Sequence, residues 1–325
     1  MEQEHIIAPI EVSLIKQELT PERFLRRTCR GNNEIYIVDC NNAPNTLREI
    51  GRLREIAFRF YGGGTGTACD LDEFDLMETP CQQLIVWDPE HDLILGGYRF
   101  LIGDWLHYDD KGQPIIATAE LFHFSEKFIR EVMPYCIELG RAFVTLEYQT
   151  SKAGAKGLFA LDNLWDGLGA LTIVYPYTKY YLGKVTIYPT FDSTARDMIL
   201  HFFQTHLGER DGLITPMIPL QNKPDVERLN ALFSSGDMAT DYKTLNREVR
   251  ALNHNIPPLI SAYLALSSNI TYYGTSLNPE FGNVDEMGIL VGFDGIHEDK
   301  KKRYIVSFIN EIKAEADRRA KQLSE

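Results

Sequence analysis

Residues 141–168 read RAFVTLEYQTSKAGAKGLFALDNLWDGL, and this stretch carries the clearest order of elements in the chain. The apolar and aromatic residues of 141–148 predict a strand, the small and basic residues of 151–157 predict a loop, and 158–168 predicts a helix. Strands that alternate with helices are the building units of a sheet with helices on its faces. We therefore expect an α/β fold.

Further strands and helices are expected on both sides of this unit. The residue patterns predict strands at 36–40, 84–87, 93–102, 171–175, 184–188 and 284–293, and helices at 47–60, 193–207 and from 300 onward. The segment 222–250 is polar and mixed, so we expect an inserted helical arm outside the core. No internal repeat occurs, which excludes a solenoid. The expected architecture is a mixed central sheet flanked by helices.

Composition narrows the classes of function. The 325 residues are 44% hydrophobic and 24% charged, as in folded proteins. The net charge of −13 excludes a general nucleic-acid binder, because such a protein needs a basic surface for phosphates. The five cysteines are odd in number and form no C-x-x-C pair, so we expect neither a zinc knuckle nor a disulfide framework. A reducing cytosol is the simpler compartment.

No apolar run approaches the about 20 residues that a membrane span needs. The stretch between Arg250 and Glu280 has no charged side chain, but Pro257 and Ser267 interrupt it. Either a buried core segment or an apolar ligand tunnel fits this pattern. We expect a cytoplasmic protein with a possible peripheral contact at the inner membrane.

Searches for common site motifs give negative results. The glycine-rich loop at 62–67 lacks the Gly-Lys-Ser/Thr ending of a phosphate loop, and the acids of 70–75 fit no EF-hand spacing. No histidine pair has zincin spacing, and no Gly-x-Ser-x-Gly elbow occurs. We therefore expect no metal and no tightly bound cofactor.

The charge distribution singles out the segment 141–188, where Lys152, Lys156, Lys179 and Lys184 gather in an otherwise acidic chain. A basic loop before a helix suits a phosphate or an acidic carrier protein at the helix N-terminus. Ordinary lysines on a solvated loop are the alternative.

Four landmarks then occur in one order: Leu53-Arg54-x-x-x-Phe58, Asp72-Glu73-Phe74-Asp75, Gly97-Tyr98-Arg99 and Glu138-Leu139-Gly140-Arg141. This set resembles the acyl-homoserine-lactone synthases and, more closely, the ornithine-lipid-type N-acyltransferases, both in the GNAT superfamily. The closer branch, whose members are sometimes labelled hemolysin-like, also has Leu164-Trp165-x-Gly167-Leu168 and Pro279-x-Phe281-Gly282-x-x-Asp285.

The resemblance implies a single GNAT-like domain over 1–325, with a core at about 30–220 and 250–295, an insertion at about 221–250 and a C-terminal helix at about 300–325. It also implies transfer of a fatty acyl group, often 3-hydroxylated, from acyl carrier protein to the amino group of a small amino acid. Glycine is favoured and ornithine comes next; acyl-CoA is the other possible donor. The product is a lyso-aminolipid.

Two alternative functions stay open. Lactone synthesis would use S-adenosylmethionine, but Gly64 replaces a tryptophan of the lactone synthases. A non-catalytic lipid-binding or membrane-lytic protein is the second.

The resemblance also assigns roles to residues. Glu138 is the expected general base, and Arg141, Asp75, Arg99 and Arg54 complete the catalytic set. One of the arginines is expected to grip the substrate carboxylate, while a buried structural ion-pair network is the alternative for Arg54, Asp75 and Arg99. The expected substrate contacts are Phe58, Asp72, Phe143, Val144 and Thr145, with backbone N–H groups around 143–145 meeting the oxyanion. The expected carrier and phosphopantetheine contacts are Lys152, Gly154, Lys156, Gly157, Lys179 and Lys184.

Overall fold

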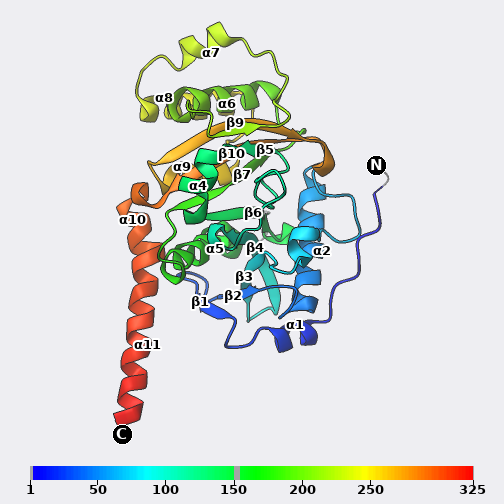
Figure 1. Cartoon of the computed structure of the whole chain (residues 1–325), viewed down its shortest axis with the longest axis vertical. Helices are drawn as coiled ribbons and strands as arrows, with labels where there is room; N and C mark the ends of the chain where they lie inside the picture. Colours follow the sequence, from blue (N-terminus) through cyan, green and yellow to red (C-terminus); the bar gives the residue numbers. More distant parts are fainter. Residues whose placement is uncertain (1–2, 150–153, 325) are drawn as a thin grey trace.

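The computed structural model describes residues 3–149 and 154–324 (Figure 1). An eight-stranded sheet with the order β1-β2-β3-β4-β6-β7-β10-β9 forms its centre. The strands are β1 (Phe24–Arg27), β2 (Glu34–Val38), β3 (Gln82–Asp88), β4 (Leu93–Ile102), β6 (Cys136–Val144), β7 (Tyr180–Ile187), β9 (Ile270–Asn278) and β10 (Val284–Gly292). A separate pair joins β5 (Phe122–Phe124) to β8 (Ile214–Pro216). Neighbouring strands are antiparallel except β6 and β7, which are parallel.

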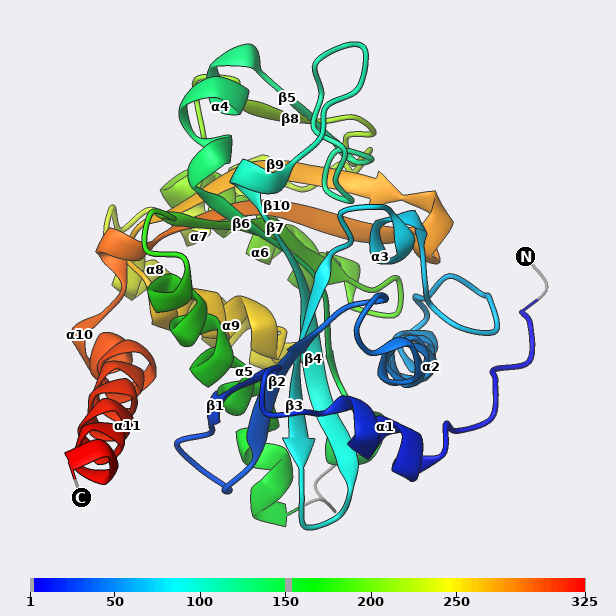
Figure 2. The ribbon, with the colours of Figure 1, turned by 60° about the horizontal axis from the view of Figure 1, so that its bottom comes forward.

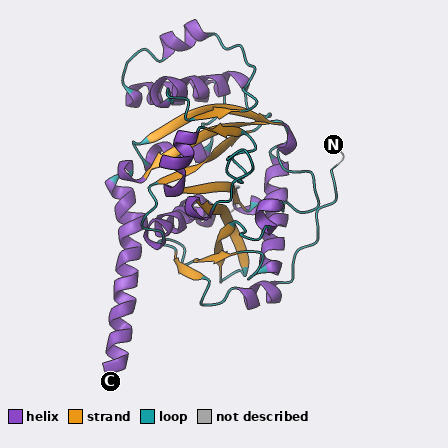
Figure 3. Cartoon of the chain, viewed as in Figure 1, coloured by secondary structure: helices purple, strands orange, loops and turns teal. Residues whose placement is uncertain are grey.

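Helices lie on both faces and at the ends of the sheet (Figure 3). They are α1 (Val12–Glu18), α2 (Pro44–Phe60), α3 (Glu73–Leu76), α4 (Glu126–Glu131), α5 (Gly154–Val174), α6 (Ser193–Leu207), α7 (Val226–Leu232), α8 (Met238–Ala251), α9 (Pro258–Leu266), α10 (Glu298–Lys300) and α11 (Ser307–Ser324). A π-helical turn, Lys301–Val306, connects the last two. No helix in the described ranges is both long and apolar enough to cross a membrane.

The two faces of the sheet differ in what covers them. On one face, α5, α6 and α9 bury the largest apolar cluster, which includes Tyr98, Leu139 and Val185. On the other face, α2 packs on β2 and β3, and the segment around β5 and α4 packs on β6, β7 and β10. Figure 2 shows α2 and α5 on opposite sides of β2, β3 and β4. The seam between the two clusters of the second face contains the charged residues described below.

The middle of the sheet opens like a fork. Strands β6 and β7 pair from Cys136 and Tyr180 to Leu139 and Gly183 and not beyond, while β6 continues along β4 and β7 continues along β10. Within residues 3–149 and 154–324, the backbone edges of 140–144 and 184–187 therefore have no strand partner on the side where they face each other. We call this opening the fork.

A bulge at Arg141 gives the outer half of β6 a new orientation. Gly97 pairs with Phe143 and Arg99 with Gly140, so one extra residue lies on β6, and Arg141 has a left-handed φ of 48°. An extra residue reverses the alternation of side chains. Leu139 accordingly packs in the cluster under α5, whereas Phe143 packs with α2 on the other face.

The structure confirms the expected strands around 84–87 and 93–102, the helix at 193–207 and the loop at 62–67. The strand expected at 171–175 is wrong, because α5 runs on to Val174 and buries Leu171 against the sheet. The strand expected at 141–148 begins earlier, at Cys136, and ends at Val144.

The polar composition of 222–250 predicted a helical arm outside the core, and this prediction is wrong. Its two helices, α7 and α8, place Leu229, Phe233, Leu245 and Val249 in the main apolar cluster beside α6. These four residues are spaced on one face of each helix, so a mostly polar segment still buries a stripe.

The C-terminal helix α11 extends away from the body of the molecule (Figure 1). Its first turn is fixed by Phe308, over which the Arg26 guanidinium lies at 5.1 Å, and by the ion pair between Arg26 and Glu311 at 2.6 Å. Past this anchor, residues 312–322 are exposed.

Candidate active site

A cluster of acids and arginines fills the seam beside β4. The Arg54 Nη1 lies 3.2 Å from Asp75 Oδ2, and the Arg99 Nη1 lies 2.5 Å from Asp72 Oδ1 and 3.3 Å from Asp75 Oδ2. The Gln83 amide donates to Asp75 Oδ1 at 2.8 Å and accepts from Arg54. The side chains of Arg54, Asp75 and Arg99 are almost completely inaccessible to solvent, so they form the buried ion-pair network considered as an alternative to a catalytic role.

The Arg141 side chain joins this cluster from β6. Its Nε lies 3.1 Å from Asp70, its Nη2 lies 3.3 Å from Asp72, and its guanidinium stacks 4.7 Å from the centre of the Phe281 ring. Gly282, with φ 84°, lies so close to Gly62 that a Cβ there would be 2.5 Å from the Gly62 carbonyl. The Phe-Gly pair at 281–282 therefore brings an aromatic ring under Arg141.

The helix cap at α3 sets the positions of the two central carboxylates. Asp72 is the N-cap residue: its side chain accepts from the Asp75 N–H, and the Asp75 carboxylate accepts from the Asp72 N–H. This reciprocal arrangement satisfies backbone donors that a helix start leaves unpaired. The acidic run at 70–75 is thus held by arginines and by its own backbone.

The pKa values of Asp70 and Asp72 shift in opposite directions. Burial raises the pKa of Asp70, although Arg141 and Arg54 oppose that rise. Asp72 is less buried, and there the charges and hydrogen bond of Arg99, with Arg141, outweigh the effect of burial and lower its pKa to about 2. The cluster therefore holds Asp72 as a carboxylate at neutral pH.

Arg99 keeps one edge of its guanidinium unused. Its Nη1 takes both carboxylate contacts, while Nε and Nη2 are buried without a hydrogen-bond partner among the described residues. A Cβ at Gly140 would lie 3.8 Å from that Nε, so the unused edge faces the start of the fork. The Nε–Nη2 edge offers two parallel N–H groups, the geometry that binds a carboxylate bidentately. A buried donor left unpaired is costly and calls for a ligand or water.

Glu138 lies on the same face of the sheet as Arg99. Its pair with Leu182 is the last but one between β6 and β7 before the fork opens. Its side chain is 1% exposed and accepts a hydrogen bond from the Thr118 hydroxyl at 2.7 Å, which leaves its other oxygen available. The cross-strand pairing places Glu138 beside Leu101 of β4 and Leu182 of β7. A buried carboxylate held at one oxygen is arranged to accept a proton at the other.

The backbone of β6 supplies one N–H to the fork. The Thr145 N–H donates to the Leu95 carbonyl of β4 at 2.9 Å, so it is not available to an oxyanion as the sequence had suggested. Because N–H groups alternate in direction along a strand, that of Phe143 also points to β4 and that of Val144 points into the fork. Of the three residues expected there, Val144 has the orientation of an oxyanion donor.

The remaining expected contacts are spread over the molecule. Phe58 packs on Phe281 with ring centres 5.2 Å apart, and Phe143 lies in the same apolar cluster. Both are core residues that support the site from behind. Lys152 lies outside the described residues, and Gly154, Lys156 and Gly157 form the start of α5.

Lys179 and Lys184 were both expected to contact the carrier, but they lie in different surroundings. Lys179 is exposed, with its Nζ 4.2 Å from the centre of the Tyr135 ring. Lys184 is instead half-buried on β7, where the charges that favour its ammonium form are those of Glu286 and Glu138. A lysine among the sheet's own acids does not form one surface with Lys179.

Sequence reasoning missed Gln83, Thr118 and Glu286 as members of the site. Glu286 had a recognisable signal, because it is a charge directly before the apolar run MGILVG (287–292) in the predicted strand 284–293. Its side chain is 3% exposed. The other two are polar residues in ordinary surroundings and gave none.

The glycine-rich loop at 62–67 has a structural role. The buried Glu55 carboxylate accepts from the N–H groups of Thr65 and Gly66 and from the Arg59 guanidinium. This loop therefore binds an anion that belongs to the chain itself, and it covers the end of α2.

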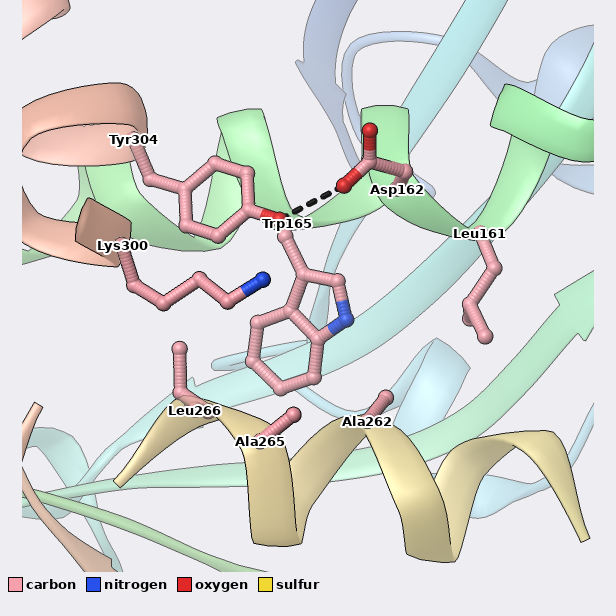
Figure 4. A pocket seen from close by; sticks show the side chains of 8 residues that line it. All are labelled: Leu161, Asp162, Trp165, Ala262, Ala265, Leu266, Lys300 and Tyr304. Atoms are coloured by element: carbon pink, nitrogen blue, oxygen red, sulfur yellow. Dashed lines mark hydrogen bonds between the residues drawn. The ribbon is translucent and has the colours of Figure 1, made fainter. Parts of the chain in front are cut away.

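A shallow pocket between α5, α9 and the π-helical turn contains none of the expected site residues (Figure 4). Trp165 lines it, and the Tyr304 hydroxyl donates to Asp162 at 2.6 Å across its rim. It lies on the sheet face that α5 covers, opposite the acid–arginine cluster.

A parallel strand pair that opens into a fork, a bulged strand with a free N–H and a buried glutamate beside it define a GNAT-type acyltransferase. The family model for the acetyltransferase (GNAT) domain matches residues 53–157, from α2 to the start of α5.

Two curated relatives cover nearly the whole chain. A glycine N(alpha)-acyltransferase of Phocaeicola vulgatus is 54% identical over 95% of this chain and 94% of its own length, and one of Bacteroides thetaiotaomicron is 56% identical over 94% and 91%. No solved structure matches the chain significantly. The chain belongs to the GNAT acyltransferase family, and it is an N-acyltransferase. An enzyme of this class is not the non-catalytic lipid-binding protein that the sequence had left open.

Proposed function

We propose that this enzyme transfers a fatty acyl group, in its usual form 3-hydroxylated, from acyl carrier protein to the amino group of glycine. The product is an N-acylglycine, a lyso-aminolipid. The observation that carries the proposal is the fork, with Glu138 and the free edge of Arg99 on one side of it. The two relatives named glycine N(alpha)-acyltransferases support glycine as the acceptor.

The donor arm fits the unpaired strand edges of the fork. Phosphopantetheine contains two amide groups, and an extended chain with amides binds an open strand edge through backbone hydrogen bonds. The edges of residues 140–144 and 184–187 are the open ones. In this pose the thioester lies near the point of the fork, and a backbone N–H of β6 beside the bulge at Arg141 meets its carbonyl oxygen.

The acceptor is held by its two charged ends. The free Nε–Nη2 edge of Arg99 binds the glycine carboxylate, and the free oxygen of Glu138 accepts the hydrogen bond of the ammonium group. Arg54 and Asp75 contact neither end in this pose and act by fixing Arg99.

The reaction then needs no covalent acyl-enzyme. Glu138 takes one proton from the glycine ammonium, directly or through one water, and the amine attacks the thioester carbon. The oxyanion is stabilised by that backbone N–H of β6. As the C–S bond breaks, the nitrogen loses its second proton to Glu138, which has passed the first proton to water. Holding both reactants in line supplies much of the rate. No resident metal or cofactor takes part in this proposal.

The carrier protein is proposed to dock beside the start of α5. The basic residues Lys152 and Lys156 alternate in the sequence with the glycines Gly154 and Gly157 there, whereas the exposed Lys179 follows the other end of α5. An acidic carrier is attracted by such charges, with association that weakens as salt rises. Because the product has a long acyl chain, the proposal includes a peripheral contact of the cytoplasmic enzyme with the inner membrane.

The test is mass spectrometry of the product. Purified enzyme is incubated with 3-hydroxypalmitoyl carrier protein and an equimolar pool of the twenty amino acids, ornithine and S-adenosylmethionine. We expect one new mass, that of N-(3-hydroxypalmitoyl)glycine. An ornithine adduct would overturn the acceptor assignment, and consumption of S-adenosylmethionine would favour lactone synthesis. Product from palmitoyl-CoA but not from the carrier-bound donor would overturn the carrier assignment.

A further inference from the structure

Three charged side chains stand on one face of three neighbouring strands around the fork. Glu138 of β6 pairs with Leu182 of β7, and Glu286 of β10 pairs with Thr186 of β7. Lys184 lies between those two positions of β7, and residues two apart in a strand point to the same face. Lys184 is therefore flanked by a glutamate on each side of it across the sheet.

Lys184 occupies a special position on β7. The last pair between β6 and β7 is Leu139 with Gly183, so Lys184 is the first residue of β7 beyond the point of the fork. Its partner on β10 is Gly288, where a Cβ would lie 2.8 Å from the ring of Phe122. Opposite Lys184 there is thus neither a side chain nor room for one.

The Lys184 ammonium group has no hydrogen bond and no ion pair within 4.0 Å among residues 3–149 and 154–324, although two acids lie on its face. Glu286 is itself held by the Thr186 hydroxyl at 2.9 Å and by the Asn278 amide at 3.5 Å. The charges of Glu286 and Glu138 favour the ammonium form of Lys184, and those of Arg141 and Arg99 oppose it. Glu120, at an exposed position, adds a third carboxylate whose charge interacts with Lys184.

We propose that Lys184 is the general acid that protonates the thiolate leaving group, and that Glu286 is the positioning residue that keeps this lysine charged and at the fork. The inference rests on the proposed function, in which the thioester lies at the point of the fork. As the N–C bond forms and the C–S bond breaks, the sulfur takes the bond electrons and one proton from Lys184 Nζ. Glu138, which has passed the ammonium proton to water, takes the second proton from the nitrogen, and water returns one to Lys184.

The surroundings suit that role. An alkyl thiol has a pKa of about 8.5, so its thiolate is a poor leaving group unless a proton reaches it. Burial lowers the pKa of Lys184 from its ordinary value, which brings this ammonium closer to the pH at which a general acid works best. Arg141 and Arg99 cannot serve, because an arginine does not release its proton.

The experiment compares two donors whose leaving groups differ in acidity. With 3-hydroxypalmitoyl carrier protein the leaving group is the alkyl thiolate of phosphopantetheine, whereas with the 3-hydroxypalmitoyl thioester of 4-nitrothiophenol it is a stable aryl thiolate that needs no proton. Turnover with glycine is measured for the wild type, Lys184→Met, Lys184→Arg and the control Lys243→Met, an exposed lysine on α8. The ratio of the two rates for one preparation does not depend on how much of the variant is folded.

We expect Lys184→Met to lose about 100-fold with the carrier-bound donor and less than threefold with the aryl thioester. Lys184→Arg keeps the charge without a releasable proton, so it should behave like Lys184→Met, and Lys243→Met should match the wild type. Equal losses on both donors, or recovery with arginine, would overturn the role of Lys184. If the wild type makes no N-acylglycine from either donor, the proposed function itself fails, and that result is distinct from an unchanged donor ratio.

Discussion

The two faces of the central sheet are built from the same strands and contain opposite chemistry. On β6, Leu139 packs under α5 while its neighbour Glu138 lies among polar groups on the other face. On β7 and β10 the same holds for Val185 against Lys184 and for Met287 against Glu286. The side-chain period of two lets one short strand contribute to the core and to the site at once.

This comparison explains why the face with the buried carboxylates also contains several arginines. Buried carboxylates are costly unless charges and hydrogen bonds compensate them. On the apolar face the same depth of burial is favourable without any partner. Stability and function should therefore respond separately to changes on the two faces, apart from the ion pairs that serve both.

The largest expected effect on stability is that of Asp75→Asn. Asp75 is completely buried and contacts Arg54, Arg99 and Gln83, so its loss leaves two buried guanidinium groups without their shared partner. Breaking a buried pair in this way costs about 3–5 kcal/mol. Urea unfolding of the variant measures it, with the exposed Asp110→Asn as the control, expected within about 0.5 kcal/mol of the wild type. A change below 1 kcal/mol would show that the cluster does not support the polar face.

Glu138→Gln should affect turnover and little else. The amide keeps the size of the side chain and the hydrogen bond from Thr118, but it cannot take a proton. We expect turnover with glycine to fall about 100-fold, the usual contribution of a general base. The exposed Glu131→Gln on α4 is the matched control. Wild-type turnover in Glu138→Gln would remove this residue as the base.

The pH dependence of stability should change in Asp72→Asn. The folded state lowers the pKa of Asp72 to about 2 from an ordinary 3.8, so this carboxylate stabilises the fold above pH 3.8, and that contribution disappears as the pH falls toward 2. The shift corresponds to about 2 kcal/mol. The difference in unfolding free energy between wild type and variant, measured from pH 6 to pH 2, should shrink by that amount. A constant difference would contradict the sign or the size of the shift.

The smallest expected effect belongs to the surface. Lys156→Ala removes a positive charge from the first turn of α5, and we expect a roughly two- to threefold rise in KM for the acyl carrier protein at low salt. The rise should disappear at about 0.5 M salt, where the charges are screened. Lys243→Ala on α8 serves as the control. If Lys156→Ala leaves KM unchanged at low salt while the wild type is salt-sensitive, the carrier docks elsewhere.

Much of the sheet could be predicted because its strands are short apolar runs with clear ends. The strands at 84–87 and 93–102 were found through the turn at 88–92, and the helix at 193–207 through its spacing. The strand predicted at 171–175 was wrong, because these residue types suit a strand but the residues before them continue the helix α5. Packing against the sheet overrode that local preference.

The sequence predicted which residues belong to the candidate site better than it predicted how they are arranged. The four motifs brought Arg54, Asp72, Asp75, Arg99, Glu138 and Arg141 together in advance, and the structure gathers them in one seam. The bulge at Arg141 could not be foreseen, because a single extra residue in a strand leaves no mark on composition. Without that bulge the alternation of β6 gives the wrong face for Phe143.

The surroundings of Lys184 could not be predicted from the sequence, for a related reason. From the sequence it is one of four lysines in a basic stretch, and nothing local separates it from Lys179. Only the pairing of β7 with β10, about 100 residues farther along, puts it beside Glu286.

One measurement tests most directly the claim that the two faces have separate tasks. Glu138→Gln and Leu139→Ala change adjacent residues on opposite faces, and each variant is assayed for both unfolding free energy and turnover per folded molecule. We predict that Leu139→Ala loses about 2–5 kcal/mol of stability and keeps its turnover. Glu138→Gln should keep its stability within about 1 kcal/mol and lose turnover about 100-fold. If both variants lose stability and turnover together, the two faces do not divide these tasks.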